Sequence, residues 1–239
     1  MSTRNKLIII ASSLVGAGLV FAVIALLMVD FDFTRLGTEK YVTNEYTFSE
    51  SFKNISINGD TEDITFVRSD DATCKVVCYE DESELHDVNV RTDTLTIEEK
   101  KSRMWHFGIS THKPTITVYL PDRDYGTIVI HTDTGDTKMS DVQCQDYYSE
   151  CDTGSLFLKN VIASGSYHFQ LDTGDVHFDR CDAKEIYIET DTGDIDGTLL
   201  TDKVFLTDTD TGDVNVPKAV SGGRCEITTD TGDITIQVP

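Results

Sequence analysis

The sequence predicts an all-β protein: a right-handed parallel β-solenoid with coils of about 19–20 residues, preceded by one N-terminal transmembrane helix. Three observations support this fold class. A tripeptide recurs at an even period, strand-like alternation surrounds each copy, and a long uncharged run lies near the N-terminus. The length of 239 residues suits one domain with an appendage, or two small domains.

The apolar run at residues 7–29 (LIIIASSLVGAGLVFAVIALLMV) contains no charged side chain. About 20 apolar residues let a helix cross a bilayer, whereas a cleavable signal peptide has a shorter apolar core. Basic residues precede the run and acidic residues follow it. Because basic flanks stay in the cytoplasm, we expect a single-pass protein of the cell membrane with an extracellular C-terminal domain. The expected segments are a cytoplasmic tail (1–6), the transmembrane helix (7–29), a linker (30–39) and an extracytoplasmic β-solenoid domain (40–239).

The tripeptide Asp-Thr-Gly begins at residues 133, 152, 172, 191, 210 and 230, so successive copies lie 19 or 20 residues apart. So even a period indicates a repeat architecture rather than a set of separate sites. Alternating apolar and polar residues come before each copy, as in EIYIET (185–190), and a shorter alternating segment follows it. Each repeat therefore predicts two strands, and the change of parity at the glycine predicts a corner between them.

One coil of this size cannot bury its own apolar face, but coils stacked about 4.8 Å apart can. The repeats from residue 127 onward therefore predict a parallel β-solenoid, and the chirality of parallel crossovers predicts a right-handed one. Residues 40–125 carry weaker repeats, which we expect to form irregular first coils, with residues 100–113 as a loop. In the copy at 210 the preceding apolar residues are displaced by one, which suggests a β-bulge.

The six cysteines bear on disulfides, because the domain is expected outside the cytoplasm. Cys74 and Cys78 lie four residues apart on one predicted strand, about 13 Å, which is too far for a bond. Cys151 and Cys225 fall at inward positions of the repeat and are expected in the core. We therefore predict no disulfide within the repeats.

Several stretches in the first half resemble the DUF4097 family of β-strand-repeat proteins. They are FKNISINGD (52–60), DTLTIEEK (93–100) and ITVYLPDRDYGTIVIHTDTGD (116–136), followed by the repeated DTGD corners. The resemblance covers roughly residues 40–239. Members are often labelled putative adhesins and include LiaG-like membrane-anchored proteins of Gram-positive bacteria. The resemblance implies a right-handed β-helix, an exposed location and no established enzymatic activity.

One copy, CDTGS at 151–155, matches the active-site signature of aspartic proteases. Such an enzyme needs two carboxylates that share a proton, one from each of two lobes or subunits. Asp152 is one of six equivalent corner residues, and nothing in the sequence selects a pair. We therefore interpret this aspartate as structural.

Stacked coils place the aspartates in two columns, for which the sequence leaves two functions open. Each aspartate can accept hydrogen bonds from backbone N–H groups at its turn, or the columns can bind Ca²⁺, which takes six to eight oxygens. No other cofactor is expected. The first column contains Asp133, Asp152, Asp172, Asp191, Asp210 and Asp230, and the second contains Asp136, Asp175, Asp194, Asp213 and Asp233, with Ser155 in the gap.

Three further features suggest contacts with a partner. Trp105, His106 and Phe107 form an aromatic patch after a basic stretch, as either a partner-binding tip or a loop folded onto the domain. His168 and His177 flank one corner at outward positions, where they are either surface residues of a sheet or, with Asp172 or Asp175, ligands of a metal ion. The last strand, DITIQVP (233–239), has no capping helix, so either Pro239 and a loop blunt its edge or a partner strand pairs there, which makes the edge a candidate binding surface.

The charge balance narrows the function. With 42 acidic and 20 basic residues the net charge is −22, which excludes nucleic acid as a partner because its phosphates would be repelled. We expect a non-enzymatic, membrane-anchored surface module for adhesion, scaffolding or envelope sensing, whose partner is another envelope protein or a surface ligand. The alternatives are a calcium-binding surface module and a polysaccharide-acting enzyme, for which the repeats supply acids but few bases.

Overall fold

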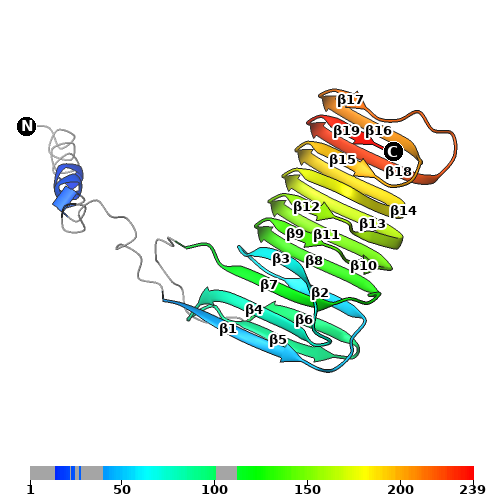
Figure 1. Ribbon diagram of the computed structural model, residues 1–239. Helices are drawn as coiled ribbons and strands as arrows, with labels where there is room; N and C mark the ends of the chain where they lie inside the picture. Colours follow the sequence, from blue (N-terminus) through cyan, green and yellow to red (C-terminus); the bar gives the residue numbers. More distant parts are fainter. Residues whose placement is uncertain (1–13, 22, 25–26, 28–39, 101–111) are drawn as a thin grey trace, which may run out of the picture. The chain divides into compact units, whose positions relative to one another are not determined.

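The computed structural model describes residues 14–21, 23, 24, 27, 40–100 and 112–239 (Figure 1). The described residues before position 28 are helical. No helix in this part of the chain is both long and apolar enough to cross a membrane. The strands belong to a separate compact unit. The predicted tail, the linker and the patch of Trp105, His106 and Phe107 lie outside the described residues.

The all-β class is confirmed by the strands of this unit. They are β1 (Tyr41–Phe48), β2 (Asn54–Asn58), β3 (Asp63–Ser69), β4 (Cys74–Asp81), β5 (His86–Arg91), β6 (Thr94–Glu99), β7 (Thr115–Pro121), β8 (Thr127–Thr134), β9 (Thr137–Ser140), β10 (Gln143–Cys144), β11 (Asp146–Thr153), β12 (Leu156–Lys159), β13 (Ile162–Thr173), β14 (Val176–Thr192), β15 (Ile195–Leu199), β16 (Lys203–Thr211), β17 (Val214–Asn215), β18 (Gly223–Thr231) and β19 (Ile234–Gln237).

The repeats stack as coils, and each coil gives one strand to each of two sheets (Figure 1). Sheet 1 holds the strands before the glycine corners, in the spatial order β5, β6, β2, β8, β11, β13, the later part of β14, β18 and β16. The short strand β10 belongs to the same sheet and pairs with the start of β13. Sheet 2 holds those after the corners, in the order β1, β4, β7, β3, β9, β12, the early part of β14, β15, β19 and β17. From the coil of β6 and β7 onward, neighbouring coils pair in parallel, as the repeat predicts.

The core lies between the two sheets, at the positions that the alternation places inward. Phe169 and Ile188 before the corners, and Val176 and Ile195 after them, are at most 3% exposed. The predicted change of parity at the glycine is therefore confirmed. The predicted burial of Cys151 and Cys225 is also confirmed, and all six cysteines are buried free thiols.

The corner glycines form a column in which only glycine fits. Gly174 has φ +155°, and a Cβ built on it would lie 1.9 Å from the carbonyl oxygen of Gly154 in the neighbouring coil. The same contact recurs at 2.0 Å or less from Gly154 to Gly232 along the stack. The requirement is therefore both conformational and steric.

A second corner closes each coil at the other end of the short strands. Its residues Asp141, Asn160 and Arg180 have φ values of +57°, +51° and +55°. Asn160 Nδ2 donates to Asp141 Oδ1 at 2.7 Å, and Arg180 donates to Asn160 Oδ1. Asp and Asn tolerate the left-handed conformation better than most residues, which suits them to this position.

The order of coils in space departs from their order in the sequence at both ends. β18 pairs with β14 on one side and with β16 on the other, so the coil of β18 and β19 lies between its two predecessors. Figure 1 shows β19 between β15 and β17. At the other end, β2 lies between β6 and β8. The prediction that the C-terminal strand forms the open edge is therefore wrong.

The open edge belongs instead to β16 and β17, the copy that the sequence marks as imperfect. β16 pairs with β18 in continuous register, so the predicted bulge is wrong. Its inward positions carry Phe205, Thr207 and Thr209, none of them fully buried, while Leu206 points outward and is 47% exposed. Because its inward residues bury less apolar surface, this coil loses the least hydrophobic stabilisation when one of its sides faces solvent.

Residues 40–125 only partly match the predicted irregular coils, because the sheets there are mixed. β5 pairs antiparallel with β6, and β4 pairs antiparallel with both β1 and β7. Thr92 and Asp93 both have positive φ and form the two-residue turn of the β5–β6 hairpin. Two consecutive residues with positive φ form a hairpin turn whose twist matches that of the flanking strands. The chain therefore reverses direction between β5 and β6.

Candidate functional site

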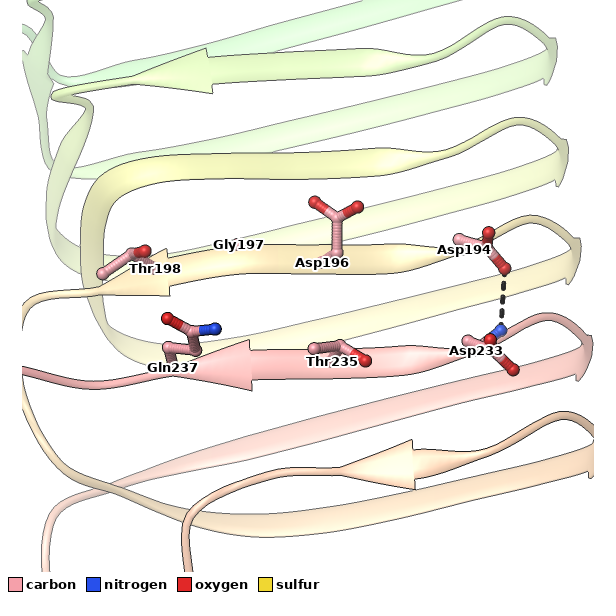
Figure 2. Close-up of a pocket in the computed structure, with 7 residues that line it drawn as sticks. All are labelled: Asp194, Asp196, Gly197, Thr198, Asp233, Thr235 and Gln237. Atoms are coloured by element: carbon pink, nitrogen blue, oxygen red, sulfur yellow. Dashed lines mark hydrogen bonds between the residues drawn. The ribbon is translucent and has the colours of Figure 1, made fainter.

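The second aspartate column accepts hydrogen bonds from the backbone of the next coil. Asp175 Oδ1 accepts from the amide of Asp194 at 2.8 Å, and Asp194 Oδ1 accepts from the amide of Asp233 at 2.7 Å (Figure 2). Ser155 fills the gap in the same way, because its hydroxyl oxygen accepts from the amide of Asp175 at 3.1 Å. Each of these side chains therefore stabilises the neighbouring coil rather than its own turn.

The first column, from Asp133 to Asp230, is exposed to solvent throughout. Its charge acts on Asp60 at the N-terminal end of the stack. Burial, and then the neighbouring charges of Asp133 and Glu62, raise the pKa of Asp60. Carboxylates that lie close together in stacked coils repel one another, and this repulsion favours the protonated form of Asp60. Calcium binding by the two columns stays a prediction.

Asp172 and Asp175 provide a matched pair for testing the two columns. Asp175→Ala removes the acceptor for the amide of Asp194 and is expected to lower the free energy of unfolding by about 1 kcal/mol. Asp172→Ala, at an exposed position of the same coil, is expected to change it by less than about 0.5 kcal/mol. Urea unfolding of the two variants measures the difference, and equal losses would contradict the distinct roles.

The same variants test calcium. We expect Ca²⁺ added to metal-stripped protein to leave the thermal midpoint unchanged, since the second column already accepts backbone hydrogen bonds. A rise in the midpoint that both Asp172→Ala and Asp175→Ala reduce would support calcium binding instead.

A groove of about 430 Å³ runs along the outer side of sheet 2, between β15 and β19 (Figure 2). Asp194, Asp196 and Asp233 supply its carboxylates, while Thr198, Thr235 and Gln237 supply neutral polar groups. Among the described residues that line the groove, none is Lys or Arg. The arrangement therefore offers acids without the basic partner that the polysaccharide-acting enzyme requires.

His168 and His177 do not come together as the sequence allowed. His168 lies in sheet 1, whereas His177 lies in sheet 2 and pairs with Asp196 of the next coil. Of the two interpretations, the structure supports surface residues, because the corner between the histidines turns their strands onto different sheets and both side chains are exposed.

The outer face of sheet 1 carries a ladder of rings, of which Tyr148 and His168 are exposed and Tyr187 is half-buried. Tyr148 and His168 have ring centroids 5.9 Å apart, and His168 and Tyr187 have theirs 6.1 Å apart. A groove of about 260 Å³ beside the ladder is lined by polar residues that include Gln170 and Glu189. Sequence reasoning missed this ring ladder, although all three rings occupy the same outward position, four residues before the corner aspartate.

A buried cluster of charged groups lies at the N-terminal end of the stack. Glu62, Glu80 and His86 are 5%, 1% and 1% exposed. His86 Nδ1 lies 2.6 Å from Glu80 Oε2, and His86 Nε2 lies 3.2 Å from Glu62 Oε1. Asn44 donates to the other oxygen of Glu80 at 2.6 Å, and the amide of Asp60 donates to Glu62 at 2.8 Å. The cluster joins the turn before β3 to β4 and β5.

The charges in this cluster stabilise one another. Burial alone would lower the pKa of His86, but its contacts with Glu62 and Glu80 outweigh burial and raise it to about 9. Burial alone would raise the pKa of Glu80, but hydrogen bonds from His86 and Asn44 lower it. The imidazole is therefore protonated and both carboxylates are ionised at neutral pH.

Sequence reasoning missed this cluster because its members come from separate elements. One signal was present. In β4 the residues Cys74, Val76 and Cys78 take the inward parity, and Glu80 continues it. A charged residue at an inward position needs a partner, and the partner is supplied by the start of the next strand.

The family to which the chain belongs follows from its sequence and fold. The family model described as Toastrack DUF4097 matches residues 52–239. No curated protein sequence is similar to the chain.

One solved structure with a TM-score above 0.5 shares the fold at low identity, and two others match with lower scores. A structure named a "putative cell adhesion protein", from Clostridium sporogenes, has a TM-score of 0.51 and 14% identity, and the match covers 84% of this chain and 100% of that one. A "putative adhesin" from Bacteroides fragilis has a TM-score of 0.44 and 15% identity, with 83% and 97% covered. A "putative lipid binding protein" from Parabacteroides distasonis has a TM-score of 0.33 and 13% identity, with 84% and 95% covered. With the family model matching most of its length, the chain belongs to the Toastrack DUF4097 family.

Proposed function

We propose that this chain is a membrane-anchored, non-enzymatic binding module that displays its β-domain outside the cell for adhesion, scaffolding or envelope sensing. The observation that carries the proposal is the ring ladder of Tyr148, His168 and Tyr187 on the outer face of sheet 1. Aromatic side chains that are apolar on one part and polar on another are favoured at binding surfaces.

The strand stack supports a binding role because it holds the ladder rigidly. The three rings project from β11, β13 and β14, which pair in continuous register at these positions. Beneath them the core rings of Tyr147, Tyr167 and Phe169 pack with centroids between 4.9 and 6.3 Å apart. A partner that contacts the face therefore meets side chains whose positions are already set, which lowers the entropic cost of binding.

The proposed membrane anchor is inferred from the sequence. The uncharged run at 7–29 is long enough to span a bilayer, and the described helical residues within it present apolar side chains, with Leu14, Leu19 and Phe21 69%, 63% and 72% exposed. Exposed apolar side chains of this density favour an apolar environment. With basic residues before the run, the β-domain is placed outside the cell.

The similar structure from Clostridium sporogenes adds a likeness of fold, and its name points to cell adhesion. The fold alone does not give the function. The outer faces of the stack are the surfaces to test.

His168 and His177 provide a matched test, because both are exposed and lie in the same coil on different sheets. A photo-crosslinking residue is placed at position 168 or 177 of the full chain in intact cells, and the crosslinked products are identified by mass spectrometry. We expect a specific product from position 168 and none from position 177. Products that are equal at both positions, or found only from position 177, would contradict binding through the ring ladder.

Protease added outside intact cells is expected to digest the β-domain, and full protection would contradict the proposed location.

A further inference from the structure

We infer that the open edge of β16 is a dimerisation surface, where β16 pairs antiparallel with β16 of a second copy of this chain across a two-fold axis. The surface lies at the C-terminal end of the strand stack. It is separate from the ring ladder and does not depend on the proposed function.

The core is left uncovered at this end of the stack, where Figure 1 shows β17. β18 is the one described strand that pairs with β16. In β18 the inward residues Cys225 and Ile227 are fully buried. Their partners in β16, Phe205 and Thr207, are only half-buried, and Val214 of β17 is 45% exposed although it pairs with a buried residue. Among the described residues, the core therefore lacks a covering layer here.

The two sheets end differently at this surface. In sheet 2 the last strand, β17, has two residues and is soon followed by Pro217, and short strands and proline both protect a sheet edge from further pairing. In sheet 1 the last strand, β16, has nine residues and no proline. Its outward residue Leu206 is 47% exposed. β16 therefore offers a row of unpaired backbone groups and an apolar side chain, which suits the addition of a strand.

The sequence of β16 is complementary to a copy of itself. In a two-fold antiparallel pair centred on Thr207, this threonine lies opposite its own copy, and threonine pairs across strands are favourable. Phe205 then lies opposite Thr209. Leu206 lies opposite Asp208 and diagonal to the Leu206 of the copy, within reach of an apolar contact. In this register no charged residue of β16 lies directly opposite a like charge.

Neighbouring registers bring aspartates together. Centring the pair on Leu206 places Asp210 opposite Asp202. Centring it on Asp208 places this residue opposite its own copy. Like charges directly opposite destabilise a strand pair, and a slip that makes inward residues face outward residues is excluded by the buried face. The exposed aspartates of β16 therefore select one register.

A second copy covers more of this surface than a peptide strand can. A peptide would pair with β16 alone, whereas a copy related by the two-fold axis also brings its own β17 and its uncovered inward residues to the interface. The contact uses the same surface on both copies, so it closes as a dimer instead of extending into a filament.

The full chain in detergent micelles is used to measure the association by sedimentation. We expect dimers whose fraction rises with protein concentration. Leu206→Lys places a charge in the interface twice and is expected to raise the dimer dissociation constant by about tenfold or more. Phe157→Lys is the matched control, because Phe157 is 39% exposed on the interior strand β12, and it should leave the dimer intact. Circular dichroism confirms that both variants are folded.

A disulfide test measures the register. Residues directly opposite have Cα atoms about 4.5–5.5 Å apart, so Thr207→Cys is expected to give a disulfide-linked dimer on oxidation. Thr209→Cys is expected to give none, because Thr209 lies opposite Phe205 and its own copy is about 13 Å away. The native cysteines are all buried and do not compete.

A monomeric wild type, a dimer that persists in Leu206→Lys, or equal disulfide formation at positions 207 and 209 would each overturn the inference. So would larger oligomers without the disulfide at position 207, which indicate a head-to-tail contact. The disulfide comparison stands even if Leu206→Lys fails to fold.

Discussion

Gly174→Ala is expected to lower the free energy of unfolding by about 3 kcal/mol or more, since backbone strain and overpacking contribute about 1–3 kcal/mol each. The added methyl group would lie 1.9 Å from the carbonyl oxygen of Gly154, and the backbone at Gly174 has φ +155°. Neither partner is a flexible side chain, so the coils themselves must separate. Chemical unfolding of the full chain measures the loss.

Two controls distinguish this steric effect from a general sensitivity of the corner. Thr173→Ala changes the exposed residue beside the glycine and is expected to cost less than about 0.5 kcal/mol. Gly212→Ala makes a similar clash, 2.0 Å from the Gly232 oxygen, but in the outermost coil, which has a neighbour on one side only. We expect a smaller loss there, because that coil can move outward. A loss at Gly212 as large as that at Gly174 would contradict the explanation.

His86→Ala is expected to destabilise the protein by about 3–5 kcal/mol, because it leaves Glu62 and Glu80 buried without their cation. His131→Ala is the matched control. That histidine also pairs with a glutamate, Glu150, but both side chains are exposed, so its loss should cost less than about 1 kcal/mol. Urea unfolding measures both variants, and equal losses would contradict the role assigned to burial.

The stability difference between wild type and His86→Ala is expected to depend on pH in a defined direction. The pKa of His86 is raised from 6.5 to about 9, so its contribution is complete below 6.5 and is lost as the pH rises through about 9. The pKa values of Glu62 and Glu80 are lowered from 4.5, so their contribution is present above 4.5 and is lost as the pH falls through their folded values. The difference should therefore be largest between about pH 4.5 and 6.5, and a difference that grows toward pH 9 would contradict it.

The repeat made much of the fold predictable, because a corner that needs glycine and strands that need alternation both leave local signals. Gly154 and Gly174 mark corners in the sequence for the same reason that the coils stack through them. The inward residues before and after each corner, such as Ile188 and Ile195, follow from parity alone. Such local signals also identified the aspartates that accept hydrogen bonds from the next coil.

The order of the coils could not be predicted, because parallel strands of equal parity present equivalent edges to any neighbour. β14 offers to β18 the same backbone groups that it would offer to β16. The buried cluster could not be predicted either, because Glu62 reaches Glu80 and His86 only through the long-range pairing of β3 with β7 and of β7 with β4. Alternation indicates that a residue faces inward, but it does not identify the side chain opposite.

The inserted coil has a consequence for biosynthesis. A chain emerging from the ribosome delivers β16 and β17 before β18 and β19, yet among the described strands β16 pairs with β18 alone. Until β18 has been made, the strand at 203–211 lacks its native neighbour and can occupy the edge of β14 that β18 must later take. The coil of β16 and β17 therefore reaches its native place only after the coil of β18 and β19 has been synthesised and inserted.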